Sequence, residues 1–298
     1  MPGAFIMKIL AISDLGSWEG LKSIFDKTKP DVVALAGDLI SDGFAEFRAS
    51  VFEKIPKFKQ ERKILMKRFG VTLSKTGSYC LNGNNFSVWA DALDSLEDKY
   101  EASSEFEKIR KTIHTDKFYD FLRYAGKKSS VIVVKGDHDE DFKNEYNLEL
   151  INSIRKCAEI SGKLLNIDGM NFLGLGFNET HYFRVLRPLV KKYQNKVDVL
   201  VTHAEQERMP ILSQFSPKLI IRGHFGSGKY YVNNIPSVFT ADAYYSTINI
   251  GFNGIIDIIQ YAKNHDKKIT ILEKGSCAPW FSNKSEFEIY SWLKPYSE

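Results

Sequence analysis

Residues 130–139 read S-V-I-V-V-K-G-D-H-D, and they carry the pattern from which the fold is predicted. The apolar run at residues 130–134 has the length and the branched side chains of a strand buried on both faces. A lysine and a glycine follow it, and then three polar side chains in succession, Asp137, His138 and Asp139. A buried strand that ends in this way is typical of the carboxyl edge of an α/β sheet, where such sheets hold their sites.

The same pattern, a short apolar strand followed by turn residues and a polar side chain, occurs four more times. The strands are predicted at residues 7–13, 32–36, 197–201 and 218–221, and the polar side chains that follow them are Asp14, Asp38, His203 and His224. A helix is expected at residues 18–27, between the first two strands, which makes a βαβ unit and therefore a parallel pair. Asp14 and Asp38 should consequently lie at the carboxyl ends of neighbouring strands.

The second half of the chain first alternates between helices and strands and then becomes rich in strands. We expect helices near residues 145–156 and 181–193, and a hairpin around Asp168-Gly169. Further strands are predicted near residues 229–233, 246–250, 254–261 and 268–273. Helix-linked strands followed by a strand-rich end indicate a layered α/β fold built around two sheets.

Residues 41–129 have a different pattern, with apolar residues at helical spacing. Trp89 and Leu93 belong to one such stripe. Pro56 is expected to end an earlier helix, and Ser104 is expected to cap a later one. The chain is therefore predicted to consist of a core at residues 1–40 and 130–275, a mainly helical insertion or cap at residues 41–129, and a C-terminal tail at residues 276–298.

Charge is segregated within this insertion. Residues 51–75 hold eight Lys or Arg against two Glu, whereas residues 91–107 hold seven Asp or Glu against one Lys. The basic run at residues 54–68 could bind nucleic acid. A solvated helix face, whose charge is offset by the acidic run, is the favoured interpretation.

The composition is that of an ordinary globular protein. Of the 298 residues, 26% are charged, and the formal net charge of +4 is too small to indicate nucleic-acid binding on its own. The three cysteines form no CxxC pair, which favours a reducing compartment. The start of the chain does not fit a signal peptide, and no apolar stretch approaches the roughly 20 residues that span a bilayer. We therefore expect a cytoplasmic protein without a membrane partner, in an oligomeric state that is left open.

Five potential metal ligands thus follow buried strands: Asp14, Asp38, Asp137, His203 and His224. Carboxylate and imidazole groups together suit Mn, Zn or Fe ions. Each of these residues stands beside a turn-forming residue, so polar turns and helix caps are the alternative explanation. The occurrence of five such residues in one chain favours the metal site over that alternative.

Taken in order, these motifs resemble those of the calcineurin-like metallophosphoesterases. That family shows D-x-H or D-x-G, then GD, then GNH-D/E, then a lone His after a strand, then GHxH. The corresponding motifs here are Asp14-Leu15-Gly16, Gly37-Asp38, Gly136-Asp137-His138-Asp139, His203 and Gly223-His224-Phe225-Gly226. The resemblance covers residues 7–250 without the insertion, and it implies an α/β fold, a layered αββα metallophosphoesterase-like sandwich with a helical insertion.

The resemblance also implies a role for each site residue. The ligands of the family's second metal position correspond to Asp38, Asp137, His203 and His224. His138 matches the residue that donates a proton to the leaving oxygen. Asp139 would orient the imidazole of His138 and favour its charged form.

The first metal position is incomplete in this sequence. It keeps Asp14 and Asp38, but Gly16 and Gly226 stand where the family usually has His. Family members with D-x-G supply a Tyr at the position of Ser41. At the second position Asp137 replaces the usual Asn, and its negative charge should attract a divalent cation more strongly. We therefore expect one tightly bound ion and a second that is weak or absent.

The favoured hypothesis is a metal-dependent phosphoesterase that hydrolyses a phosphomono- or phosphodiester, such as a nucleotide or nucleic acid. The insertion joins the core between the second and third motifs, so its ends should emerge beside the metal, where a cap could select the substrate. The alternative hypothesis is a catalytically degenerate member that serves as a binding or scaffold protein, because first-position ligands are missing. Of the remaining histidines, His114 and His181 are expected at the surface, and His181 could approach the site.

Overall fold

The computed structural model describes residues 6–14, 18, 20–40, 48, 51–73, 79–81, 86–139, 145–224, 227–233, 235–240, 245–251, 254–263, 269–272 and 293–295. Its internal contacts separate the chain into two compact units. Unit 1 comprises Met1–Asp42 and Phe118–Glu298, and unit 2 comprises Gly43–Lys117. The boundary falls near the start of helix α6 (Asp116–Ala125), so most of this helix belongs to unit 1 and not to the segment predicted as an insertion.

The first sheet of unit 1 has seven strands in the order β15-β14-β13-β1-β2-β5-β6. Strands β1, β2, β5 and β6 are parallel to one another, and β13, β14 and β15 extend the sheet with antiparallel pairings. In sequence order the strands are β1 (Ile6–Ile12), β2 (Val32–Ala36), β5 (Ser130–Val134), β6 (Cys157–Glu159), β13 (Tyr245–Gly251), β14 (Gly254–Lys263) and β15 (Ile269–Leu272).

The second sheet also has seven strands, in the order β16-β11-β12-β10-β9-β8-β7. Strands β8, β9, β10 and β12 are parallel, and β7 pairs with β8 in the predicted hairpin. The strands are β7 (Leu164–Ile167), β8 (Met170–Leu175), β9 (Val199–His203), β10 (Leu219–Gly223), β11 (Ser227–Val232), β12 (Ile235–Thr240) and β16 (Leu293–Pro295). Strand β16 belongs to the segment predicted as a tail, most of which lies outside the described residues.

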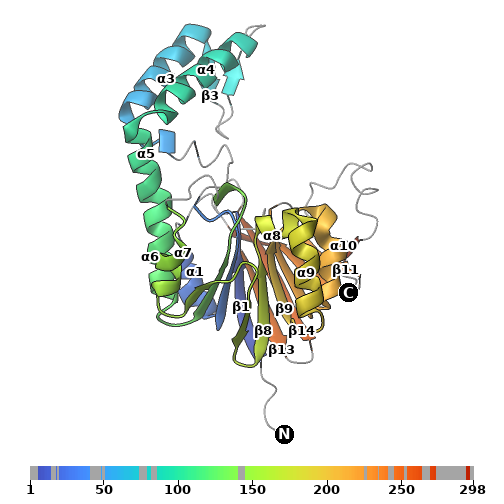
Figure 1. Ribbon diagram of the computed structural model, residues 1–298. Coiled ribbons are helices and arrows are strands. Elements are labelled where there is room, and N and C mark those ends of the chain that lie inside the picture. Colours follow the sequence, from blue (N-terminus) through green and yellow to red (C-terminus); the bar gives the residue numbers. More distant parts are fainter. Residues whose placement is uncertain are drawn as a thin grey trace. The chain divides into compact units, whose positions relative to one another are not determined.

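Helices cover the outer face of each sheet, as Figure 1 shows. The first sheet is covered by α1 (Leu21–Thr28), α6 and α7 (Leu148–Ser153), and the second by α8 (Phe177–His181), α9 (Phe183–Tyr193) and α10 (Met209–Leu212). The short 3₁₀ helices η3 (Gln206–Arg208) and η4 (Ser213–Phe215) flank α10. The helix predicted at residues 181–193 is α9, and the preceding α8, which ends at His181, was not predicted.

Three apolar clusters fill the spaces between these layers. Along β1, Ile9 and Ala11 face the second sheet, whereas Leu10 and Ile12 face α1 and α6. On the far side, the other face of the second sheet packs against α9 and α10. The central strands are thus buried on both faces, which explains why their sequences are continuously apolar. The predicted αββα sandwich is confirmed.

Unit 2 is mainly helical and has its own small core. Its elements are α3 (Pro56–Phe69), β3 (Val71–Leu73), β4 (Tyr79–Leu81), α4 (Phe86–Glu101), α5 (Ser104–Arg110) and the π-helix η1 (Lys111–Thr115). Phe52 and Phe58 stack with their ring centroids 4.4 Å apart, and Phe106 packs against Phe52. Aromatic packing of this kind stabilises a unit too small to bury much apolar surface.

Pro56 follows the helical residues Val51 and Phe52, which end before it as predicted, and it also begins α3, because proline is well accommodated in the first turn of a helix, where its missing N–H costs no hydrogen bond. Two other details of unit 2 differ from the sequence predictions. The cap of α5 is Ser103, whose Oγ accepts a hydrogen bond from the amide of Phe106, so the cap lies one residue before Ser104. His114 is buried, and burial together with the charge of Arg110 lowers the pKa of its ring to about 4.

Across the described part of the chain, every helix is too short or too polar to cross a membrane.

Candidate metal centre

Three aspartates of the site follow three neighbouring parallel strands of the first sheet. Asp14, Asp38 and Asp137 come shortly after β1, β2 and β5. Asp14 and Asp38 both have a φ of 52°, in the left-handed region that L residues rarely adopt. Strained backbone of this kind persists where the surrounding structure enforces it, and it turns both carboxylates toward the same sheet edge.

His203, the last residue of β9, bridges the two sheets. Its ring is fully buried, and Nδ1 lies 2.8 Å from the carbonyl oxygen of Ala36 at the end of β2. A carbonyl can only accept, so Nδ1 donates and the second ring nitrogen, Nε2, is the one left to face the carboxylates. Nε2 lies 2.9 Å from Oδ1 of Asp137 and 3.4 Å from Oδ2 of Asp38.

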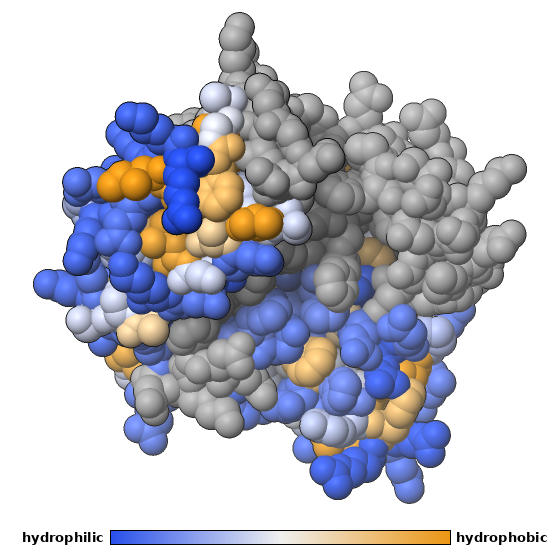
Figure 2. Space-filling model, turned by 90° about the horizontal axis from the view of Figure 1, so that it is seen from above, coloured by the Kyte–Doolittle hydropathy of each residue, from blue (hydrophilic) through white to orange (hydrophobic). Residues whose placement is uncertain are grey.

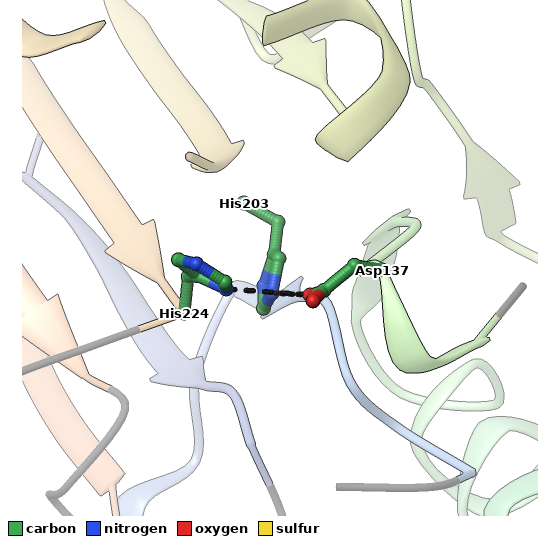
Figure 3. Close-up of side chains that lie close together, drawn as sticks. All are labelled: Asp137, His203 and His224. Atoms are coloured by element: carbon green, nitrogen blue, oxygen red, sulfur yellow. Dashed lines mark hydrogen bonds and ion pairs between the residues drawn. The ribbon is translucent and has the colours of Figure 1, made fainter. Parts of the chain in front are cut away.

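His224 follows β10 and approaches from the neighbouring strand. Its Nδ1 lies 3.3 Å from Oδ1 of Asp137, the oxygen that His203 also contacts (Figure 3). Its backbone has a φ of 85°, and its amide donates a hydrogen bond of 3.1 Å to Oδ2 of Asp14. The two imidazole rings therefore converge on Asp137, with their centroids 5.0 Å apart.

The potential ligand atoms form three overlapping groups. In each group these atoms all lie within 4.8 Å of one another, and the groups are Asp137-His203-His224, Asp14-Asp38-His203 and Asp38-Asp137-His138. All five residues predicted as metal ligands belong to these groups. Oxygen and nitrogen donors at this spacing could enclose Mn, Zn or Fe.

The electrostatics of Asp137 and His203 fit a cation between them. Burial acts to raise the pKa of Asp137, but the hydrogen bonds from His203 and His224 lower it far below its usual value. Burial acts to lower the pKa of His203, but hydrogen bonds with Asp137 and Asp38 raise it well above its usual value. The raised pKa of His203 favours a positive charge between these residues, and a divalent cation would supply that charge in place of a proton.

Asp14 fits a cation for a different reason. Burial, together with the charge of the nearby Asp38, raises the pKa of its carboxyl group to about 6, although the charge of His203 offsets part of the effect. Within the described residues, its Oδ1 is buried without a hydrogen-bond partner. A buried carboxylate oxygen without a donor is costly, and a bound cation would compensate that cost.

A family model for calcineurin-like phosphoesterases matches residues 7–227. The chain belongs to the calcineurin-like phosphoesterase family. No curated protein matches the chain.

Several solved structures are similar to this family member at low sequence identity. One is TT1561 of Thermus thermophilus, which is 10% identical, with 90% of this chain and 99% of that chain covered and a TM-score of 0.46. Another is GAP50, described as the anchor in the inner membrane complex of Plasmodium, which is 8% identical, with 90% and 88% covered and a TM-score of 0.46. A third chain is 14% identical, with 90% and 99% covered and a TM-score of 0.47.

Two glycines of the family motifs are required by close approach. A Cβ on Gly136 would lie 2.0 Å from Oδ1 of Asp38, and one on Gly37 would lie 2.3 Å from Nδ1 of His203. Both distances are far shorter than real Cβ contacts, so any side chain there would displace a candidate ligand. The glycine before each aspartate is thus explained by packing within the site. Gly16, Ser41 and Gly226, named above for the first metal position, lie outside the described residues.

Asp139 occupies a different setting from the one the resemblance implied. It is fully buried, and its carboxylate accepts hydrogen bonds from the amides of Leu39, Ile40 and Gly136, at 2.8, 3.1 and 2.9 Å. Burial and the charge of Asp38 nevertheless raise its pKa to about 6. The carboxylate therefore ties together the loops that carry Asp38 and Asp137. Orientation of His138 by Asp139 stays a prediction.

His138 lies at the rim of the group. Its side chain is 40% exposed, and Nε2 is 3.7 Å from Oδ2 of Asp137. Its amide donates a 3.1 Å hydrogen bond to Oδ1 of Asp38, which fixes the backbone while the ring remains accessible.

Sequence reasoning missed the aromatic side of the site. The ring of Phe177, in α8, lies 5.7 Å from that of His224 and stacks on that of His181 at 5.0 Å. Phe177 comes two residues after β8, a further parallel strand end beside the five that carry the predicted ligands, and this position was the available signal. His181, which was expected at the surface with a possible approach to the site, is thus linked to His224 through one ring.

Proposed function

We propose that this protein is a metal-dependent phosphoesterase. The convergence of His203 and His224 on one oxygen of Asp137, with Asp38 beside them, is the observation that supports the proposal. These four residues would hold the tightly bound ion. When bound, a divalent ion neutralises phosphoryl oxygens and activates water for attack.

The protein's own residues have separable tasks in this proposal. His203 is held by the Ala36 carbonyl in the tautomer that presents Nε2 to the site. Asp139 keeps the loops after β2 and β5 in register by accepting three amide hydrogen bonds. His138, exposed at the rim, is the candidate proton donor to the leaving oxygen.

The second ion is proposed to bind weakly or not at all. Asp14 and Asp38 are the carboxylates at the position of this second ion. The third member of their group, His203, is also a candidate ligand of the tightly bound ion. Burial raises the pKa of the Asp14 carboxyl group to about 6, so this position loses a charged ligand below about pH 6, where the Asp137 carboxylate stays ionised. This same weakness supports the alternative proposal, a family member that binds a phosphorylated ligand without turning it over.

Two further proposals concern unit 2 and the substrate. Unit 2 is joined to unit 1 by residues that flank the second and third motifs, which supports a role in choosing a phosphomono- or phosphodiester. Its basic segment at residues 54–68 is a proposed contact for nucleic acid. In the described residues, part of this charge is already compensated, since Arg62 pairs with Glu53.

The test of the main proposal is metal-dependent hydrolysis. Purified protein is stripped with a chelator, reloaded with Mn²⁺, Zn²⁺ or Fe²⁺, and assayed on nitrophenyl phosphate and bis(nitrophenyl) phosphate. Activity that returns with one of these ions and is absent in His203→Ala supports an enzyme. Stoichiometric metal binding without activity on either ester class would favour the binding protein.

A further inference from the structure

Helix α9 has one apolar and one basic face. Leu186 and Val190 are buried in the cluster that packs on the second sheet. Arg184, Arg187 and Lys191 are exposed and recur at the i, i+3, i+7 spacing that places side chains on one face of a helix. The apolar face is thus satisfied within the protein, and the basic face is directed to solvent.

This basic face carries uncompensated charge. Residues 182–196 contain five Lys or Arg and no Asp or Glu. In the described part of the chain, no carboxylate lies within ion-pair distance of Arg184, Arg187 or Lys191. Unpaired cations on a helix that already packs well by its other face indicate an anionic partner.

Exposed aromatic rings lie among these cations. Tyr182 is 46% exposed and Phe183 is 43% exposed. The guanidinium of Arg184 lies 5.4 Å from the ring centre of Tyr182, and that of Arg208 lies 4.2 Å from the ring centre of Phe183. Figure 2 shows hydrophobic side chains set among strongly hydrophilic ones on the described surface. Aromatic rings beside arginines can stack on a base and pair with its phosphate at the same time.

A continuous row of rings connects this surface to the candidate metal centre. From His224 the row runs through Phe177 and His181 to Tyr182, with centroid distances of 5.7, 5.0 and 4.9 Å. Arg208 also donates a hydrogen bond to the carbonyl oxygen of His181. The surface therefore belongs to unit 1 and is connected to His224 of the candidate metal centre by three ring contacts.

We infer that Tyr182, Phe183, Arg184, Arg187 and Lys191 form a binding surface for single-stranded nucleic acid. This inference rests on the proposed function for its purpose: a single strand that followed the row of rings from Tyr182 to His224 would bring a phosphodiester to the metal centre. Single strands expose the faces of their bases, whereas duplexes stack them internally, so exposed tyrosine and phenylalanine rings favour a single strand. A membrane surface fits less well, because an interfacial helix turns its apolar face outward and α9 buries that face.

The test is a binding measurement that does not depend on hydrolysis. A fluorescently labelled deoxythymidine oligonucleotide is titrated with full-length protein in chelator, and anisotropy is recorded at several salt concentrations. R184A/R187A should weaken binding on the order of tenfold and lower the salt slope by about 1.4, the value for two lost phosphate contacts on a single strand. Tyr182→Ala should weaken binding about five- to hundredfold with an unchanged slope, and Tyr182→Phe should retain binding.

A matched pair on another helix of unit 1 is the control. K22A/K27A removes the same charge from exposed positions of α1 and should leave oligonucleotide binding within about twofold of the unmodified protein. Equal losses in both double variants would overturn the inference, as would absence of binding at low salt. Binding to anionic phosphatidylserine vesicles that R184A/R187A abolishes, without oligonucleotide binding, would assign the surface to membranes instead. Failure of the hydrolysis assay with intact oligonucleotide binding would overturn the proposed function and leave this surface standing.

Discussion

Asp14 and Asp137 occupy equivalent places in the fold but differ in their electrostatics. Each follows a parallel strand of the first sheet, and each belongs to a potential metal-binding group that contains His203. Yet hydrogen bonds from two imidazoles lower the pKa of Asp137 despite its burial, whereas burial raises that of Asp14 to about 6. The strand ends thus determine where the carboxylates lie, and the imidazoles determine which of them stays ionised at acidic pH.

The largest effect is expected on the Asp137 side. Asp137→Ala should remove the tightly bound metal and reduce phosphoesterase activity by at least about 10³-fold, because the ion's contribution of several kcal/mol is lost with it. Asp137→Asn is the matched control, since it keeps an oxygen ligand, and it should retain metal with weaker affinity. Elemental analysis after dialysis, together with turnover, measures both. Full metal occupancy in Asp137→Ala would show that Asp137 is no more important than Asp14 for holding the tightly bound ion.

His138 should affect turnover without affecting the metal. His138→Ala is expected to reduce turnover about 10²–10⁴-fold, the usual cost of losing a positioned acid, while metal content stays the same. The loss should be smaller for nitrophenyl esters than for alkyl esters, because a good leaving group needs little protonation. Equal losses on both ester types would count against the proton-donor role.

Much of this site could be predicted because its residues follow strands. A buried parallel strand is recognisable as an apolar run, and the residues after it must lie at the carboxyl edge, so Asp14, Asp38 and Asp137 could be placed together without a structure. The same holds for His203 and His224 on the second sheet. Strand β12 escaped prediction because Pro236, its second residue, is unfavourable in a central strand.

The contacts that tune the site could not be predicted. The carbonyl of Ala36 fixes the tautomer of His203 from a distance of 167 residues in sequence, and any residue could supply that carbonyl. Asp139 likewise binds backbone amides about 100 residues away, which leave no signature in the side chains. Backbone partners across two sheets depend on how the layers pack, and a single sequence does not show that packing.

Metal binding at the Asp137-His203-His224 group should release a proton from His203. The pKa of His203 is raised well above its usual value in the metal-free protein, so Nε2 carries a proton at pH 7 that the ion must displace. Calorimetric titration with Zn²⁺ or Mn²⁺ in two buffers of different ionisation enthalpy should give about one proton released per ion. The Asp14→Asn variant should release the same number of protons per ion, because the released proton comes from His203 and not from Asp14. Binding heats that do not depend on the buffer would contradict this assignment.

The smallest effect concerns the stability cost of Asp14. Because its pKa is raised from 3.8 to about 6 in the folded protein, the folded state holds its proton more tightly than the unfolded state does. The contribution of this group to the free energy of unfolding therefore falls as pH rises from about 4 to about 6, and the loss is complete above that range. Asp14→Asn lacks this titration and should be more stable than the unmodified protein by about 3 kcal/mol at pH 7, with little difference at pH 4.

Denaturant unfolding in the presence of chelator measures this difference at the two pH values. Asp139 also has a pKa raised to about 6, but it is present in both proteins, so its contribution cancels in the comparison. With saturating Mn²⁺ the stability advantage of Asp14→Asn should become smaller or reverse if Asp14 holds a second ion, since that ion would stabilise only the protein that has the aspartate. A stability gain that is the same at pH 4 and pH 7 would show that the cost of Asp14 lies in its shape and not in its buried charge.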